Sequence, residues 1–409
     1  MEIPMAHSKS AVSGYSPLQF LGSLGAGGLV VSFFMYLMWM TPHKGQPIPS
    51  FATIADTWQT ASIPMMVTIA VAMAGIAVFA AVHLRLLAWN ISRYREWASS
   101  QQARALAKSN AESQLMAIPL TLAMTVNAMF IVGAVFVPGL WEMAEVLFPL
   151  ALIAFAAVGV YATRIFLRFF TRVVTEGGFE CSRNNSLAQM LPAFAFAMVG
   201  VGFSASAAMS HNAALSATAW IGASVFTVAA ILLGLIALVM GFRAMMEHTV
   251  AEETAPTLWI VIPIVTVVGI SLYRLNMALA HNFGAEWHPA SVFGFLVTLF
   301  SIQLLFAALG YAVLRKQGYF ARYVSGTERS PGSWALICPG VALFVFANFV
   351  INAGLIKIGV LAKFSVNYLA LYAPLVVLQI VTVVIFFKLY MKLVRQNGTQ
   401  HATQHLPAE

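Results

Sequence analysis

The chain is dominated by long apolar segments separated by short polar or turn-rich breaks. Most segments are about 20 to 28 residues long, and a helix of about 20 residues crosses the hydrocarbon core of a bilayer. They lie near residues 17–41, 62–90, 113–137, 143–170, 186–209, 216–242, 256–279, 290–314, 333–356 and 366–392. The pattern therefore predicts an all-α integral membrane protein with ten transmembrane helices.

Composition supports the same class. Hydrophobic residues make up 60% of the 409 positions and charged residues 9%, against roughly 25% charged residues in soluble domains. We expect one ten-helix transmembrane domain over residues 17–394, with an N-terminal tail, 1–16, and a C-terminal tail, 395–409. Two isolated thiols, Cys181 and Cys338, favour neither a disulfide nor a zinc site. We expect no metal, no cofactor and no enzymatic activity.

The distribution of basic residues predicts the orientation of the chain. If both termini lie on one side, that side holds 18 of the 22 lysine and arginine residues, the opposite side holds Lys44, Lys357 and Lys363, and Arg274 falls within a span. Loops rich in lysine and arginine stay in the cytoplasm. We therefore expect a multi-pass protein of the cell (inner) membrane with both tails cytoplasmic. The net charge of +8 is explained by contact with anionic lipids of the bilayer, without a nucleic-acid partner.

A repeat runs through the odd-numbered spans. Pro119, Pro192, Pro263 and Pro339 each lie about a third of the way into a span from the cytoplasmic side, at spacings of 73, 71 and 76 residues. A fixed period indicates one repeated unit, here a helical hairpin with a short outer turn. An interior proline kinks a helix, so the four prolines favour helices that bend around a shared lumen. Bending for ordinary helix packing is the alternative.

The first span departs from this repeat, because its proline, Pro17, lies at its start. It instead carries a glycine-rich stretch, Gly22 to Gly28, with Gly25 at its centre. Small residues let helices approach closely, so Gly25 could line a narrow passage or serve only in packing. The even-numbered spans are rich in Leu, Val, Ile and Phe and fit an outer ring that faces lipid.

These features together resemble the tellurite-resistance and dicarboxylate-transporter family, which includes plant slow anion channels and fungal sulfite and malate carriers. The resemblance covers nearly the whole chain and rests on the glycine-rich first span, the proline-containing odd spans, and the segments Ala255-Pro256-Thr257-Leu258-Trp259-Ile260 and Trp334-Ala335-Leu336-Ile337-Cys338-Pro339. It implies five helical hairpins in a pseudo-fivefold ring around a central pore lined by the odd helices, commonly assembled as a homotrimer.

The resemblance also implies a phenylalanine gate immediately before the proline of the ninth span. This chain has Cys338 at that position, and a cysteine is too small to close a pore alone. Phe194 and Phe196, near Pro192, and Phe349, on the helical face of Cys338, are alternative gate candidates. Ordinary packing is the more common role of such rings and is the favoured alternative for each.

Charge and polarity within the spans indicate which ions could pass. All 14 acidic residues lie in loops, tails or span ends, which disfavours carboxylate proton relays and cation filters. Arg274 lies eleven residues after Pro263, on the same helical face, and could attract anions at the outer mouth, snorkel to the headgroups or pair with Glu286. Polar pore candidates on the odd spans are Thr121, Thr125, Gln189, Thr266 and Asn352, although interhelical hydrogen bonds would explain them too.

Together, these observations predict an anion channel or facilitated anion transporter that passes chloride, nitrate, sulfite, tellurite or a small dicarboxylate. A membrane anchor subunit that binds haem or quinone is the rival hypothesis, because such anchors use paired histidines on facing helices. His83 and His248 fall near the cytoplasmic ends of spans, whereas His211 and His281 fall near the outer ends and could be neighbours.

Overall fold

A computed structural model describes residues 15–395 of the chain. The predicted tails, 1–16 and 395–409, therefore lie almost entirely outside the described residues. Within residues 15–395 the regular elements are helices, without strands. Ten of these helical segments are long and apolar enough to span a membrane, which confirms the predicted number of spans and the membrane class.

The ten long helices fall into two groups by position. The inner helices are α1 (Phe20–Met40), α5 (Ala117–Phe136), α7 (Leu191–Met209), α9 (Val261–Phe283) and α11 (Ile337–Phe349). The outer helices are α3 (Ile63–Trp97), α6 (Ala144–Glu176), α8 (Ala213–His248), α10 (Pro289–Lys316) and α12 (Val366–Tyr390). Two short helices, α2 (Phe51–Thr60) and α4 (Gln101–Leu106), lie in the loops on either side of α3.

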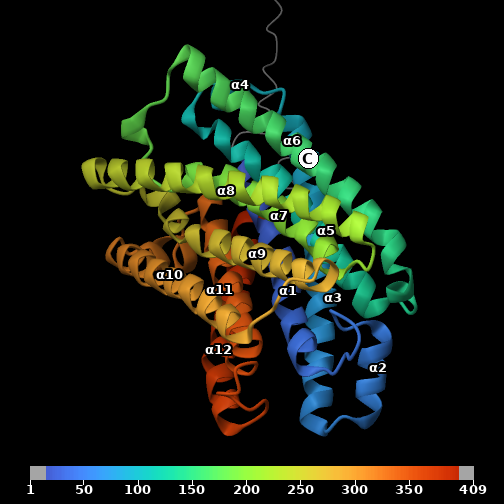
Figure 1. The fold of residues 1–409 in the computed structure, drawn as a ribbon. Helices are drawn as coiled ribbons and strands as arrows, with labels where there is room; N and C mark the ends of the chain where they lie inside the picture. The colour runs from blue at the N-terminus through green and yellow to red at the C-terminus, as the bar shows by residue number, and fades with distance from the viewer. Residues whose placement is uncertain (1–14, 396–409) are drawn as a thin grey trace, which may run out of the picture.

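Burial separates the two groups clearly. In the most apolar stretch of each span, 56 to 94% of the residues are buried in the inner helices and 17 to 28% in the outer helices. Figure 1 shows α6, α10 and α12 toward the edges of the molecule, with inner helices such as α1, α7 and α11 between them. The exposed faces of the outer helices carry large apolar side chains such as Val146, Leu232 and Val377. This is the arrangement expected when lipid is the solvent.

Helix contacts connect the inner helices to one another in a cycle. α1 contacts α5, α5 contacts α7, α7 contacts α9, α9 contacts α11, and α11 contacts α1. Each outer helix also packs against the inner helix that precedes it in the chain, so that α3 contacts α1 and α6 contacts α5. The same holds for α8 on α7, α10 on α9 and α12 on α11.

Each inner helix begins with a change of helix type. A 3₁₀ segment directly or almost directly precedes the α-helix in all five, namely η1 (Pro17–Gln19), η2 (Asn110–Met116), η5 (Ala188–Met190), η6 (Glu252–Trp259) and η8 (Pro331–Leu336). The remaining short segments are η3 (Leu140–Met143), η4 (Cys181–Arg183), and the π-helical η7 (Phe320–Ser325), η9 (Val350–Leu355) and η10 (Met391–Arg395). The continuous spans are therefore longer than their α-helical parts.

The repeated prolines lie at these junctions, which corrects the prediction that they kink α-helix interiors. Pro119, Pro263 and Pro339 are each the third residue of their α-helix, and Pro192 is the second of its own. The first turn of an α-helix has no intrahelical partner for its N–H groups, so a proline there sacrifices no hydrogen bond. Each proline therefore marks the point where the 3₁₀ segment becomes an α-helix.

Candidate functional site

A partly open cavity of about 180 Å³ lies between the inner helices. All five inner helices contribute lining residues, among them Gly28 of α1, Asn127 of α5, Met198 of α7, Arg274 of α9 and Val345 of α11. The outer helix α6 contributes as well, and so does the loop after α1, through Ile48. A volume of this size holds on the order of a dozen water molecules, which is enough for a small organic or inorganic ion.

One face of α9 runs along the cavity. Pro263, Val267, Ile270 and Arg274 all line it, and their spacings of four, three and four residues put them on a single helical stripe. Thr266 also lines the cavity, although its hydroxyl donates to the backbone oxygens of Ile262 (3.0 Å) and Ala342 (3.3 Å). The helix therefore presents a cation at one end of the stripe and apolar side chains along the rest.

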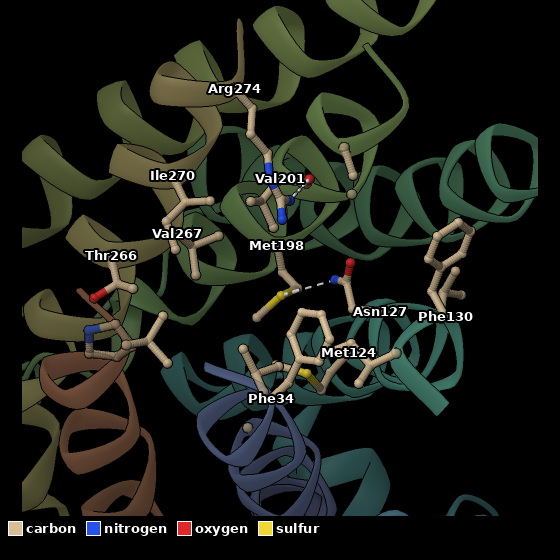
Figure 2. A pocket seen from close by; sticks show the side chains of 18 of the residues that line it. Phe34, Met124, Asn127, Phe130, Met198, Val201, Thr266, Val267, Ile270 and Arg274 are labelled. Atoms are coloured by element: carbon tan, nitrogen blue, oxygen red, sulfur yellow. Dashed lines mark hydrogen bonds between the residues drawn. The ribbon is translucent and has the colours of Figure 1, made fainter. Parts of the chain in front are cut away.

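Among the described residues that line the cavity, Arg274 is the only charged one. Its Nη1 donates to the backbone oxygen of Val201, on α7, at 3.3 Å, and Figure 2 shows the side chain extending toward that carbonyl. Within residues 15–395, no carboxylate lies within ion-pairing distance of Arg274. Glu286, the suggested partner, instead approaches His288, at 3.0 Å. A guanidinium has five N–H donors, so most of its donors remain available to a ligand.

Asn127 places a carboxamide on another wall of the cavity. Its Nδ2 donates to the backbone oxygen of Ala123 at 3.3 Å and to the Sδ of Met198 at 3.6 Å, and Figure 2 shows the second of these contacts. A thioether is a weak acceptor. The amide is therefore the second polar group whose hydrogen bonding a bound ligand could improve.

The remaining surface of the cavity is mostly apolar. Phe34, Met124, Phe130 and Met198 lie around one part of it, and Val267 and Ile270 around another (Figure 2). No aspartate or glutamate of the described part of the chain lines it. A site with one cation, one weakly bonded amide and mostly apolar walls attracts a negative charge and gives a cation no carboxylate ligand.

The structure brings together some of the residues selected from the sequence. Pro263, Thr266, Arg274, Cys338 and Phe194 line the cavity. The others are not among its lining residues: Gly25, Pro119, Pro192, Pro339, Thr121, Thr125, Gln189, Asn352, Phe196 and Phe349.

The contacts of the excluded residues explain their positions. A Cβ on Gly25 would lie 2.9 Å from a side-chain carbon of Ile337, so this glycine serves close packing of α1 on α11. Phe196 packs edge-on against Phe166 and at a tilt against Phe226, and Phe349 packs edge-on against Trp39 and Tyr273. These rings belong to the packing between helices.

The polar pore candidates outside the cavity join helices or segments to each other. Thr121 donates to the backbone oxygen of Phe20, at 3.1 Å, and Gln189 to that of Asn110, at 2.7 Å. Asn352 donates to the hydroxyl of Tyr372, at 2.9 Å. Interhelical hydrogen bonding, the alternative account of these side chains, therefore describes their contacts.

His83 lies elsewhere than the sequence suggested. Because α3 continues to Trp97, His83 is inside the spanning helix rather than near its end, and it is fully buried. Its Nδ1 lies 2.8 Å from the backbone oxygen of Ser23, and its Nε2 lies 2.9 Å from the Oγ1 of Thr125. The imidazole thus ties α3 to both α1 and α5, and Thr125 is engaged in that contact.

The two outer histidines are neighbours, as the sequence suggested. The rings of His211 and His281 are 5.0 Å apart between centroids and meet edge to face. Two imidazoles that ligate one haem must face each other across the porphyrin, and an edge-to-face pair at this separation leaves no room for that plane. Within residues 15–395, no three histidine, cysteine or acidic side chains are grouped closely enough to hold a metal ion.

Comparison with known proteins adds no family assignment: no protein-family model matches the sequence, and no curated protein matches it either. The functional argument therefore rests on the cavity and its lining residues.

Proposed function

We propose that this protein is an anion channel or a facilitated anion transporter whose pathway runs through the cavity between the inner helices. The observation that carries the proposal is Arg274, which is the only charged residue lining the cavity and has no carboxylate partner within residues 15–395. A cation in a space without fixed negative charge lowers the electrostatic energy of an anion that enters.

The wider architecture is part of the proposal. Five helical hairpins would be arranged in a pseudo-fivefold ring, each with an inner and an outer helix, as in the tellurite-resistance and dicarboxylate-transporter family. The cycle of contacts among α1, α5, α7, α9 and α11 supports this arrangement. The repeated junction from a 3₁₀ segment to an α-helix supports it too. A homotrimer of such rings follows from the resemblance alone.

The narrowest part of the pathway is proposed to lie near Cys338. In the resembled family a phenylalanine precedes the proline at this position, and both Cys338 and Phe194 line the cavity. Phe194 is the more suitable gate of the two, because its ring can block a passage that a thiol leaves open. The chain would therefore close its pore from α7 rather than from α11.

The proposed location is the cell membrane with both termini in the cytoplasm. The excess of lysine and arginine on that side supports this orientation. Peptide tags on either terminus should resist external protease in intact cells and become sensitive after permeabilisation. Digestion of one tag in intact cells would indicate an odd number of spans and would contradict the proposal.

Ion flux in liposomes tests the transport function directly. Purified protein is reconstituted, and efflux of chloride, nitrate, sulfite and a small dicarboxylate is compared with efflux of sodium and potassium. We expect anion flux above that of protein-free vesicles without a matching cation flux, at a rate that separates a channel from a carrier. Cation flux, or no flux of any ion, would overturn the proposed function.

A further inference from the structure

The cavity has a distinct polarity from one end to the other. Arg274 carries the positive charge at one end of the α9 stripe, and Ile270 and Val267 follow it one and two turns farther along the same face. Across the cavity, Phe34, Met124 and Phe130 provide apolar surface around the carboxamide of Asn127 (Figure 2). A pathway for hydrated inorganic ions alone would be expected to offer polar groups along its length.

We infer that the preferred ligand of this cavity is a monoanion with an apolar body, such as a short-chain carboxylate or sulfonate. Its charged head would contact the guanidinium of Arg274, and its hydrocarbon tail would lie along Ile270 and Val267. The inference rests on the proposed anion transport and names the class of anion that the same site favours.

The number of charges separates this class from dianions. One guanidinium can pair with one carboxylate through two parallel hydrogen bonds. A second carboxylate on the same ligand would find no second cation, because Arg274 is the only lysine or arginine among the described residues that line the cavity. Burial of an unpaired charge is strongly unfavourable. Small dicarboxylates should therefore bind less tightly than monoanions of equal length.

The apolar walls separate this class from small inorganic anions. Chloride or nitrate can reach Arg274 but cannot use the hydrophobic surface beside it, whereas each methylene group that leaves water for an apolar site gains about 0.8 kcal/mol. Four methionines, Met35, Met124, Met198 and Met209, are among the lining residues. Their flexible side chains can adjust to tails of different shape.

A series of alkanesulfonates provides the test, because sulfonates stay ionised and do not cross lipid as neutral acids. Binding of methane-, propane-, butane- and hexanesulfonate to the full-length protein in nanodiscs is measured by calorimetry, with empty nanodiscs subtracted. We expect the affinity to rise about fourfold for each added methylene, which corresponds to about 0.8 kcal/mol, until the cavity is filled. Butanesulfonate should bind more tightly than ethane-1,2-disulfonate.

Three variants make the result specific to the cavity. Arg274→Gln should abolish the binding. Val267→Phe, which fills the tail site, should end the rise in affinity at a shorter chain. Arg243→Gln alters an exposed arginine on α8 that pairs with Glu247, and it should bind like the unaltered protein.

The possible failures are distinguishable from failure of the proposed function. Affinity that is independent of chain length, or tighter binding of the disulfonate, would overturn the inferred class. If Arg274→Gln kept the same rise with chain length, the ligands would be binding without this cation, and the inference would fail. In each case, the proposed anion transport would still be tested independently, by anion flux through the unaltered protein in liposomes.

Discussion

The inner and outer helices differ in a way opposite to that of a soluble protein. In its most apolar stretch, each outer span is at least as hydrophobic as any inner span, although 17 to 28% of that stretch is buried in the outer spans and 56 to 94% in the inner spans. The outer helices are therefore at least as apolar as the inner helices, although they are far more exposed. Hydropathy therefore shows which segments of this protein span the membrane. Small and polar residues show which of these spans belong to the buried inner group.

Close approach of backbones explains what the inner helices require. In α1, a Cβ on Gly27 would lie 2.5 Å from the Cγ of Met124 and 3.0 Å from the Nδ1 of His83. Between helices in lipid, van der Waals packing and interhelical hydrogen bonds replace the hydrophobic drive of water. The inner helices therefore depend on small residues at their contacts. The outer helices face lipid, which accommodates apolar side chains of almost any size.

The largest expected effect comes from adding volume to an inner contact. Gly27→Val should destabilise the protein by about 3 kcal/mol or more, because the new side chain must displace Met124 and His83. The matched control is Gly294→Val on α10, where an added Cβ meets nothing within 4 Å. Thermal unfolding of both purified variants measures the difference. Equal melting temperatures would mean that the inner contact is not tightly packed.

The second effect concerns a buried ion pair that joins the two groups. Glu112, in the segment that leads into α5, is almost fully buried and accepts from the Nε atoms of Arg168 and Arg172, on α6, both at 3.1 Å. Hydrogen bonds to charged groups contribute about 1.5–3 kcal/mol, so Glu112→Gln should lower the stability by about that amount. A melting temperature like that of the unaltered protein would contradict this account.

The control for this pair lies on the exposed end of an outer helix. Glu247 pairs with Arg243 one turn away on α8, where both side chains are at least half exposed. Because exposed pairs of this kind are screened by solvent, Glu247→Gln should leave the melting temperature unchanged. If Glu247→Gln lowered the melting temperature as much as Glu112→Gln does, the effect would come from removing any carboxylate and not from breaking the buried ion pair.

A smaller effect, on transport but not on stability, is expected at Cys338. In a Cys181→Ser background, a small thiol-directed reagent should reach Cys338 from the cavity that it lines and reduce anion flux in liposomes. Cys338→Phe should reduce flux as well, since the ring adds bulk at the same place. A well-folded Cys338→Phe protein with undiminished flux would show that this position is not at a constriction.

Much of the fold could be predicted because every span carries its own hydropathy signal. The segment predicted at 290–314 is α10 at Pro289–Lys316. The error was larger at the end of α3, predicted at residue 90 but observed at Trp97. That extension contains Arg93 and Arg95. A helix that continues out of the hydrocarbon into water has no apolar signal to mark its end.

The candidate site could be predicted only where helix geometry was sufficient. The stripe from Pro263 to Arg274 lies on one helix, so its shared face follows from 3.6 residues per turn. Asn127 and Met198 were missed, because α5 and α7 are apolar on all sides and no periodicity marks the face that lines a cavity. Gln189 and Asn352 have their partners, Asn110 and Tyr372, in other segments, which a single sequence does not reveal.

The most direct test of the central claim is nitrate efflux from proteoliposomes that contain Arg274→Gln, compared with efflux through the unaltered protein and through Arg243→Gln. All three proteins must show the same thermal unfolding, so that a change in flux is not a change in folding. We predict that Arg274→Gln loses most of the efflux and that Arg243→Gln keeps it, because only Arg274 lines the cavity. Equal efflux through all three would contradict an anion pathway that depends on this cation.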